Sequence, residues 1–412
     1  MRQPTTLSAT GRNGVACRPR RLASFLGSAC RVLAVAAAAA LPEIASADAA
    51  PARLLIGTYT AGASEGIYLF DFDTGTGRLD PRPRQVVKAS NPSWLTLSAD
   101  HRHVYAVNEN GPGQRDAVGR VTAYRIDPCT GRLQEVDRVL SLGSEPTHSG
   151  ISQDGRYLFV ANYSVAPDPG GTLAVLPIGE HGALGPAIQV KTGRASQVDG
   201  ERQGSPHMHS AVVSPDGRTV LAQDLGGDRL QVYRYDPGRP EAPLTLDAAH
   251  PYVETPPGSG PRHLVFSRDG RHAYLTLEMA GEVAVYDCAQ GVLAQTQRVS
   301  LAPPGFSGKN GAAALHLSPD GRFLYVTNRG TDNQLVVFAV DAASGELTLV
   351  ARRSTEGLEP REFAIDPSGR YVLIANQHSD TVVIMKRDPV SGRVGETIQV
   401  LPIATPSDLK FE

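Results

Sequence analysis

A short pattern built around an Asp-Gly-Arg turn recurs along the chain and restricts the folds open to it. In each copy an apolar run leads into the turn and a second apolar run leaves it, as in LVFSRDGRHAYLTLE. The six copies begin at Ser98, Ser152, Ser214, Ser267, Ser318 and Asp366. Internal repetition with a period of roughly 50 residues indicates a solenoid, a propeller or an array.

Each repeat contains two further runs, such as EVAVYD or LVVFAV and the run that follows it. Apolar and polar residues alternate within the runs, and turn residues separate them. This pattern predicts antiparallel hairpins. No segment shows a sustained helical stripe, so the sequence predicts an all-β protein built from units of four strands.

A second kind of turn, placed after the third strand, gives an independent count of the units. It occurs seven times, in DTGTGRL, DPCTGRL, GEHGAL, DPGRPEAPLTL, DCAQGVL, DAASGEL and DPVSGRV. The C-terminal TPSDLKFE resembles the first strand of a unit, and the N-terminal LLIGTYT and GIYLFDFDTGTGRL supply the strands that would complete it. A blade shared by the two chain ends closes a ring and removes exposed sheet edges. We therefore predict a seven-bladed β-propeller of four-stranded antiparallel blades over residues 50–412.

Residues 1–49 differ in kind from the repeats. Arginines at positions 18, 20 and 21 precede the apolar run VLAVAAAAAL, and small-residue sites follow, ending at Ala47 and Ala49. This order is typical of an export signal that is removed, by a Sec or a twin-arginine route, and it predicts a periplasmic or secreted protein. The apolar run is too short to span a bilayer, and no later segment is long enough.

Charge and cysteine content narrow the function classes. The formal net charge of the 412 residues is −2, so no basic field attracts nucleic acid. Beyond the signal the chain keeps Cys129 and Cys288, which occupy equivalent late positions in blades separated by two others. That separation exceeds the ~7 Å Cα limit for a bridge, so we predict no disulfide between them. We expect a monomer.

The geometry of a blade brings two sets of residues to one face of the ring. The residues that open the first strand and those that end the second strand share that face, and strand ends lining a ring commonly form a ligand site. The openings are Ser93 and Trp94, Thr147 and His148, His209 and Ser210, Arg262 and His263, Ala313 and Ala314, Arg361 and Glu362, and Ser407 and Asp408. The second strands end at Asn108 and Glu109, Asn162 and Tyr163, Asp224, Glu278, Arg329, and Asn376 with Gln377.

The number of repeats in which an arginine occurs indicates whether its role is structural or functional. The arginines of the Asp-Gly-Arg turns recur in nearly every unit, so we assign them to turn structure. Arg262 and Arg361 open the first strand in only two units, which favours a functional role; the alternative is an ion pair between blades. Glu278 is predicted to lie beside Arg262 and is a candidate for catalysis or binding, although an exposed carboxylate would also be ordinary there.

The histidines add candidates but no metal site. His207 and His209 in PHMHS face the same side of an extended segment, and a His-x-His pair can bind zinc, but no third ligand has diagnostic spacing. His148 opens its own strand. GSGPRH leads into a strand rather than a helix, so it is not a phosphate loop. The sequence predicts no nucleophile elbow, a serine in a tight turn between a strand and a helix, so a covalent nucleophile is not indicated.

The segments GSPHMHSAVVSPDGR, QDLGGDRLQVYRYD, GSGPRHLVFSRDGRHAYLTLE and LEPREFAIDPSGRYVLIANQHSDTVVIM closely resemble the seven-bladed propeller lactonase family. That family includes the propeller-type 6-phosphogluconolactonases and the fungal carboxy-cis,cis-muconate cyclases. The resemblance runs from LLIGTYT to the C-terminus and is strongest from His207 to Met385.

The resemblance implies cofactor-free chemistry on a small carboxylated or phosphorylated lactone. The implied catalytic residues are His209, Arg262, Glu278 and Arg361, where Arg329 is an alternative to Arg361. We add His148, His207, His263, Arg329 and Asn376 as substrate-binding candidates. Glu278 or His209 would activate a water, Arg262 would stabilise the oxyanion, and Arg361 would hold a phosphate or carboxylate.

The sequence leaves two alternatives to lactone hydrolysis. The first is lactonising isomerisation of a muconate by the same residues, and the second is an exported propeller that only binds a ligand. The export signal also conflicts with a phosphorylated substrate, because 6-phosphogluconolactone is a cytosolic metabolite. Lactonase activity is therefore the firmer expectation, and the substrate's phosphate is left open.

Overall fold

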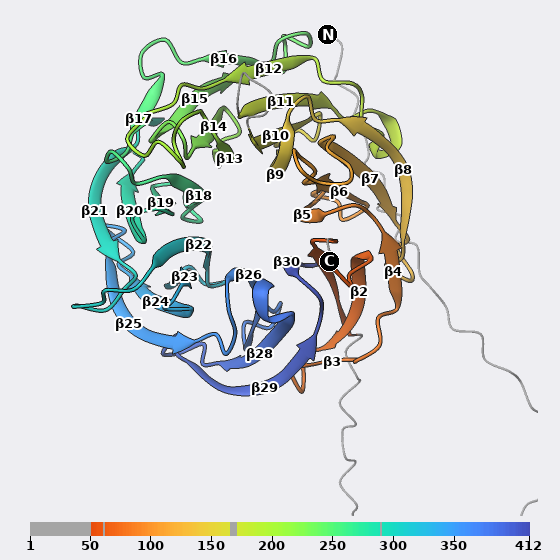
Figure 1. Ribbon diagram of the computed structural model, residues 1–412, viewed down its shortest axis with the longest axis vertical. Helices are drawn as coiled ribbons and strands as arrows, with labels where there is room; N and C mark the ends of the chain where they lie inside the picture. The colour runs from red at the N-terminus through yellow and green to blue at the C-terminus, as the bar shows by residue number, and fades with distance from the viewer. Residues whose placement is uncertain (1–50, 61, 165–170, 289–290) are drawn as a thin grey trace, which may run out of the picture. The chain divides into compact units, whose positions relative to one another are not determined.

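Seven antiparallel sheets arranged in a ring make up the fold (Figure 1). The computed structural model describes residues 51–60, 62–164, 171–288 and 291–412, so the predicted export signal lies outside the described residues. The helical elements with described bounds are two short 3-10 turns, η1 (Glu180–Gly182) and η3 (Gln377–Ser379). The predicted all-β, seven-bladed propeller is confirmed.

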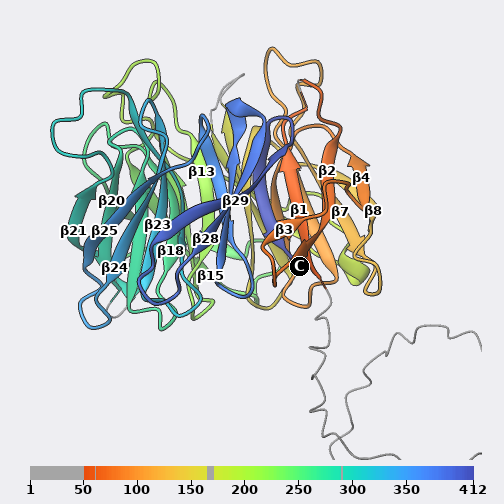
Figure 2. The ribbon, with the colours of Figure 1, turned by 90° about the horizontal axis from the view of Figure 1, so that it is seen from below.

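The strands form four concentric layers. Figure 2 shows them running between the two faces of the ring. The innermost strands are β30 (Pro406–Phe411), β5 (Pro92–Leu97), β9 (Ser144–Ile151), β13 (Met208–Val213), β18 (Pro261–Phe266), β22 (Asn310–Leu317) and β26 (Pro360–Ile365). The second strands are β1 (Ala52–Thr58), β6 (His103–Asn108), β10 (Tyr157–Ser164), β14 (Thr219–Asp224), β19 (His272–Leu277), β23 (Phe323–Gly330) and β27 (Tyr371–Asn376).

The two outer layers complete each blade. The third strands are β2 (Gly66–Asp73), β7 (Arg120–Ile126), β11 (Thr172–Pro177), β15 (Arg229–Tyr235), β20 (Glu282–Asp287), β24 (Gln334–Val340) and β28 (Thr381–Arg387). The outermost strands are β3 (Arg78–Leu79) with β4 (Gln85–Lys88), β8 (Leu133–Leu140), β12 (Gln189–Thr192), β16 (Leu244–Leu246) with β17 (Tyr252–Glu254), β21 (Ala294–Ser300), β25 (Leu347–Ser354) and β29 (Val394–Pro402).

One blade joins the two ends of the described chain, as the sequence predicts. The C-terminal strand β30 is its innermost strand and pairs antiparallel with β1, so that Ile56 lies opposite Leu409. A hydrophobic cluster that includes Leu54, Tyr371 and Leu409 packs this blade against the preceding one. The ring is therefore closed by main-chain pairing and by a buried apolar interface.

Packing between blades explains why the second strands read as nearly continuous apolar runs. Successive side chains of a strand point to opposite faces. In β6, Val104 and Ala106 enter the cluster shared with the first blade, while Tyr105 and Val107 enter the cluster shared with the next. Both faces of the sheet are thus buried, in contrast to a sheet with one solvated face.

The turn arginines are structural, but their guanidinium groups act beyond their own turns. Arg156, Arg271, Arg322 and Arg370 each donate a hydrogen bond to a backbone carbonyl in the outer turn of the following blade, at 2.6 to 3.0 Å. Within the turn itself the Ser and Asp side chains accept the backbone N–H bonds, as Ser267 and Asp269 do. The repeated arginine therefore links neighbouring blades.

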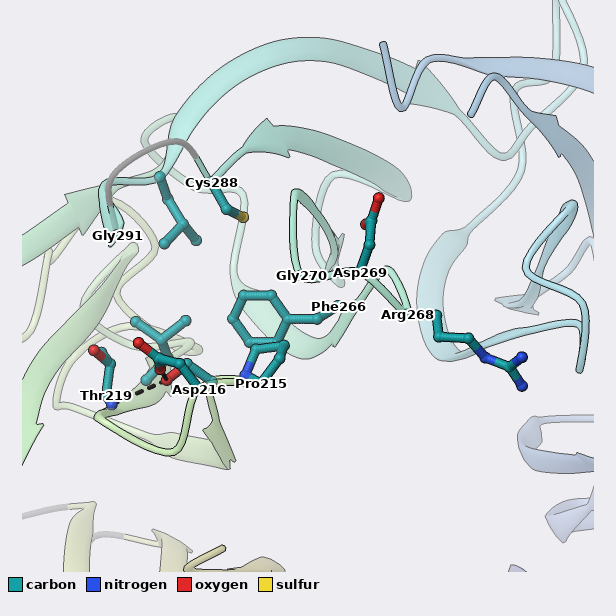
Figure 3. A pocket seen from close by; sticks show the side chains of 12 residues that line it. Pro215, Asp216, Thr219, Phe266, Arg268, Asp269, Gly270, Cys288 and Gly291 are labelled. Carbon is teal, nitrogen blue, oxygen red and sulfur yellow. Dashed lines mark hydrogen bonds between the residues drawn. The ribbon is translucent and has the colours of Figure 1, made fainter. Parts of the chain in front are cut away.

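One interface between blades is less well filled than the others, and the sequence explains it. The residue that follows the turn is His103, Tyr157, His272, Phe323 or Tyr371 in five copies, but Thr219 in the sixth. Thr219, Phe266, Cys288 and Gly291 line a pocket of about 450 Å³ at this place (Figure 3). Cys288 carries a free thiol and therefore forms no bridge with Cys129. Burial raises the pKa of that thiol to about 12.

Filling this pocket should stabilise the protein. At four other interfaces the ring of the equivalent residue packs against a glycine of the next outer turn, as Tyr371 does on Gly77, whereas Gly291 has open space beside it. We expect Thr219→Tyr to raise the free energy of unfolding by about 1 kcal/mol, the usual gain from cavity filling. Urea unfolding measures this, and Thr348→Tyr on an exposed strand position is the control. An unchanged or lower stability for Thr219→Tyr would contradict the role given to the missing ring.

Candidate functional site

A β-bulge near the start of every innermost strand positions the candidate site. The extra residues are Ser93, Thr147, His209, Arg262 or His263, Ala313 or Ala314, Arg361 and Ser407. A bulge leaves one residue outside the pairing ladder and re-aims its side chain. The bulged positions are those that the sequence predicts to open the inner strands, although the bulges themselves were not predicted.

The polar bulge residues meet in one cavity at the centre of the ring, which we call the central cavity. It is lined by Ser93, Trp94, Thr147, His209, Arg262, His263, Arg361, Glu362 and Ser407. The cavity volume is about 10 Å³, which is room for about one water molecule. We call the face where the innermost strands begin the mouth face; the opposite face, which carries the Asp-Gly-Arg turns, is the turn face.

Glu278 is the centre of a charge cluster at the mouth face. It follows the end of β19, and its Oε2 accepts from Arg262 Nε at 3.0 Å and lies 2.9 Å from Arg329 Nη2. Its Oε1 accepts from Arg202 Nη2 at 2.7 Å. The structure therefore brings Arg262 and Glu278 together as predicted, and adds two further guanidinium groups.

Burial and charge act in opposite directions on this cluster. Burial alone would raise the pKa of Glu278, but Arg329, Arg262, His209 and Arg202 hold that pKa well below its ordinary value. Arg262 is 1% exposed, and burial followed by repulsion from Arg329 lowers its pKa to about 9. At neutral pH the pair is a carboxylate and a guanidinium, and Glu278 is a weak base.

His209 is neutral and has one ring nitrogen without a partner. Burial first, and then the charge of Arg262, lower the pKa of His209 well below 6.5. Its Nε2 lies 4.0 Å from Glu278 Oε2, and its Nδ1 is buried without a hydrogen-bond partner among the described residues. A proton on Nε2, facing the carboxylate, leaves the Nδ1 lone pair as the basic position.

Arg202 was not predicted, because it lies in segment 193–207, which has no counterpart in the other repeats. Besides Glu278, its Nη2 donates to the hydroxyl of Tyr163 at 3.2 Å. The segment is anchored: Gln203 donates to the carbonyl of Leu225, and Asp199 accepts from the backbone N–H of Arg202. The sequence does contain one signal for Arg202: it lies in a long insertion directly before the PHMHS motif.

His207 lies beside the cluster rather than in the central cavity. Its Nδ1 lies 2.6 Å from the carbonyl oxygen of Tyr163, and its ring stacks on the ring of Tyr163 with centroids 4.4 Å apart. Burial lowers the pKa of His207. Of the two histidines in PHMHS, only His209 reaches the central cavity.

Arg361 belongs to a second charge cluster across the mouth face. Its Nη2 is 3.4 Å from Glu109 Oε2, and its guanidinium lies 5.1 Å from the ring centre of Tyr59. Ser93 Oγ donates to the same oxygen of Glu109. Burial would lower the pKa of Arg361, but Tyr59, Glu109 and Glu278 raise it above its ordinary value. Arg361 is a fixed positive charge.

A group of rings in tilted and edge-to-face contact is formed by Trp94, His148 and His263. The ring of Trp94 lies 4.3 Å from His148 and 5.2 Å from His263, and His263 lies 5.1 Å from His209. The backbone N–H of Ala211 donates to His148 Nδ1, and burial lowers the pKa of His148 to about 3. These rings are neutral and pack the wall of the central cavity.

Asn376 is the one predicted site residue that the structure does not bring to these clusters. Its amide donates to the carbonyl of Thr355 at 2.9 Å, and Asn108 and Asn162 make the matching bonds to Ser90 and Ser141 in their own blades. This repeated contact ties the end of the second strand to the incoming connection between blades. Arg329, by contrast, contacts Glu278 directly.

The described part of the chain contains no group of three His, Cys, Asp or Glu side chains arranged to hold a metal ion. It also contains no helix with the length and apolar character that a membrane span requires.

Asp224 is a buried carboxyl group that bonds to the backbone of His207, next to the charge cluster. It makes the stability of the folded protein depend on pH. Its Oδ1 accepts from the backbone N–H groups of His207 and Gly227, and burial raises its pKa from 3.8 to about 7. The folded state then keeps a proton that the unfolded state loses, so stability falls as pH rises from 3.8 to 7.

Replacing Asp224 removes that dependence. We expect the unfolding free energy of Asp224→Asn, minus that of the unmodified protein, to increase between pH 4 and pH 7 by at most roughly 4 kcal/mol, at about 1.4 kcal/mol for each pKa unit. Denaturant unfolding at a series of pH values measures the difference. If this difference in unfolding free energy stays constant over the range, folding does not raise the pKa of Asp224.

The sequence and the fold are both similar to those of known proteins. Residues 53–411 match the family described as "Lactonase, 7-bladed beta-propeller". The chain is 34% identical to a 6-phosphogluconolactonase of Bacillus subtilis (86% of this chain, 97% of the relative) and 32% identical to one of Formosa agariphila (87% and 99%). A solved structure of a periplasmic gluconolactonase from Pseudomonas aeruginosa is 55% identical, with a TM-score of 0.85 over 87% of this chain and 98% of that one.

Proposed function

Because the chain belongs to the family of seven-bladed β-propeller lactonases, we propose that it hydrolyses the lactone of a small sugar acid at the mouth of the central cavity. The observation that carries this proposal is that a neutral imidazole, His209, and a buried guanidinium, Arg262, both line that cavity. They lie 4.0 Å and 3.0 Å from the carboxylate of Glu278. Ester hydrolysis needs a base for water and a positive charge for the oxyanion.

His209 is the better base of the two candidates. Three guanidinium groups keep Glu278 ionised and weakly basic, whereas His209 is neutral with its Nδ1 free. Glu278 then has two supporting roles: it holds Arg262 and Arg329 in position, and it favours the His209 tautomer with the proton on Nε2. The 4.0 Å separation is too long for a hydrogen bond, so Glu278 acts on the imidazole through its charge.

Arg262 is the proposed oxyanion partner. It is almost fully buried, and Glu278 fixes its Nε, so its guanidinium is already oriented before substrate binds. A preorganised charge in a site of low dielectric stabilises a developing oxyanion more than a mobile charge in water does. The negative charge that forms on the carbonyl oxygen during attack is thus met without rearrangement.

The remaining cations favour a substrate that carries a negative charge or many hydroxyl groups. Arg202, Arg329 and Arg361 surround the mouth, and Arg202 is the most exposed of them. Guanidinium groups bind phosphate and carboxylate oxygens in pairs. The resemblance to a periplasmic gluconolactonase, together with the export signal predicted for residues 1–49, supports action in the periplasm on a sugar-acid lactone.

The direct test is lactone hydrolysis by the purified protein. We expect it to accelerate the loss of δ-gluconolactone or 6-phosphogluconolactone above the spontaneous rate, followed by acid release at constant pH. Absorbance of a muconate in the same preparation tests the isomerase alternative. If hydrolysis of every lactone in a panel stays at the spontaneous rate, the protein is a ligand-binding propeller and not a lactonase.

Arg202 should distinguish a phosphorylated from an unphosphorylated lactone. If it contacts the substrate's phosphate, Arg202→Ala should raise KM for 6-phosphogluconolactone by roughly 10-fold or more, the effect of losing a charge-assisted hydrogen bond. KM for δ-gluconolactone should change much less. Arg194→Ala, at an exposed position of the same segment, is the matched control. Equal effects on both substrates would remove Arg202 from phosphate recognition.

A further inference from the structure

Three buried polar atoms without partners among the described residues belong to side chains that line the central cavity. They are His209 Nδ1, Glu362 Oε2 and Ser407 Oγ, and the three residues are 4%, 1% and 2% exposed. Burying a polar atom without a hydrogen bond is costly, so native proteins pair nearly all of them, often with an ordered water. Three such atoms around a space for about one water molecule therefore describe a hydrated site.

Glu362 lines the cavity and has one carboxylate oxygen, Oε2, without a partner in the described part of the chain. Its other oxygen, Oε1, already accepts from the backbone N–H of Phe363 at 2.8 Å and lies 2.6 Å from His316 Nε2. These contacts hold the carboxylate from the side of the turn face, where His316 is partly exposed. They leave Oε2 as the acceptor that is free to bind a water in the cavity.

Ser407 reaches the same cavity from the neighbouring strand. It is the extra residue of the bulge in β30, so its hydroxyl is turned out of the pairing ladder. β26 and β30 are adjacent innermost strands of the ring (Figure 1). Glu362 and Ser407 thus offer an acceptor and a hydroxyl from one wall, while His209 offers a basic nitrogen from β13.

We propose that the central cavity binds the water that attacks the lactone, with Glu362 and Ser407 holding it and His209 Nδ1 accepting its proton. This inference rests on the proposed lactonase function and assigns to it two positioning residues on strands far from the Arg262–Glu278 pair. The water would approach the substrate from the interior of the ring, while the substrate enters from the mouth face.

The step balances without a cofactor. The water oxygen forms a bond to the lactone carbonyl carbon as its proton passes to His209 Nδ1, and the carbonyl oxygen takes the negative charge beside Arg262. Collapse of this intermediate breaks the ring C–O bond, and His209 returns the proton to the ring oxygen. The products are the carboxylic acid and the hydroxyl group of the open chain, and the acid then ionises to solvent.

Two substitutions test the site by kinetics. We expect Glu362→Gln to lower kcat about 10- to 100-fold with little change in KM, because a water displaced by about 1 Å attacks poorly. Ser407→Ala should lower kcat by a smaller factor, and Ser407→Thr should restore it by returning the hydroxyl. A rise in KM with kcat unchanged would overturn the proposal, because these residues would then bind substrate rather than water.

Matched variants separate this role from a structural one. Asp366→Asn replaces a fully buried carboxylate on the same chain segment that does not line the cavity. If it lowers kcat as much as Glu362→Gln does, Glu362 acts only by stabilising β26, and the proposal fails.

A crystal structure at high resolution gives a test that does not depend on activity. A water within hydrogen-bond distance of Glu362 Oε2 and Ser407 Oγ supports the site, even if no lactone proves to be a substrate. A cavity closed by side chains, or one that holds no ordered water, overturns it. Absence of lactone hydrolysis in the unmodified protein would instead contradict the proposed function.

Discussion

Replacing Arg262 by alanine should lower kcat/KM for lactone hydrolysis by about 10²- to 10³-fold, the effect of removing one oxyanion donor. The expected loss is large because Arg262 is the most deeply buried of the four guanidinium groups around the mouth, and because it lines the central cavity together with His209. Arg329 and Arg202 remain to neutralise Glu278, so the carboxylate is not left as an unpaired buried charge.

Two comparisons show whether Arg262 acts through its charge and its geometry. Arg262→Lys keeps a positive charge but loses the planar fork, so we expect it to recover only part of the activity. Arg218→Ala removes an arginine of a turn on the opposite face and should leave kcat/KM unchanged. In the unmodified protein, kcat/KM corrected for spontaneous hydrolysis should fall as pH rises through about 9, where Arg262 loses its proton.

Activity of Arg262→Ala within about threefold of the unmodified protein, with its fold intact by circular dichroism, would exclude Arg262 as the oxyanion donor. Arg329 would then be the next candidate, because its Nη2 contacts the same oxygen of Glu278. The mouth face would in that case bind substrate one blade further along the ring.

The ring and its closure could be predicted because they depend on patterns that repeat. Turn residues and alternating runs recur in each blade, and the C-terminal TPSDLKFE matches the opening of a blade, which the pairing of β30 with β1 confirms. The position of Arg262 beside Glu278 could also be predicted, since both stand at strand ends that the hairpin geometry brings to one face.

Features of single blades escaped prediction, for different physical reasons. The bulges that turn His209 and Ser407 into the cavity leave no mark in the alternation of apolar residues, because the chain resumes its register after them. Arg202 lies in an insertion that has no equivalent to compare with. The low pKa of Glu278 depends on Arg202 and Arg329, two charges that come from other segments of the chain.

His209→Ala should lower kcat by about 10²- to 10⁴-fold, the range for loss of a general base, with a smaller effect on KM. The structure gives the reason for choosing His209 over His207, which stands outside the cavity and uses its Nδ1 on the carbonyl of Tyr163. Because burial lowers the pKa of His209 well below 6.5, the unmodified protein should keep its activity as pH falls through 6, and lose it only when the imidazole becomes protonated.

Three measurements decide whether the imidazole of His209 is the base. Steady-state kinetics of His209→Ala and His207→Ala should show the larger loss of kcat for His209. Added imidazole should restore part of the activity of His209→Ala, because the truncated side chain leaves space beside the cavity, and a residue that only packs the wall would not respond in this way. An equal or larger loss for His207→Ala, or activity that already declines near pH 6.5 in the unmodified protein, would move the base away from His209 and toward a group that is protonated more easily.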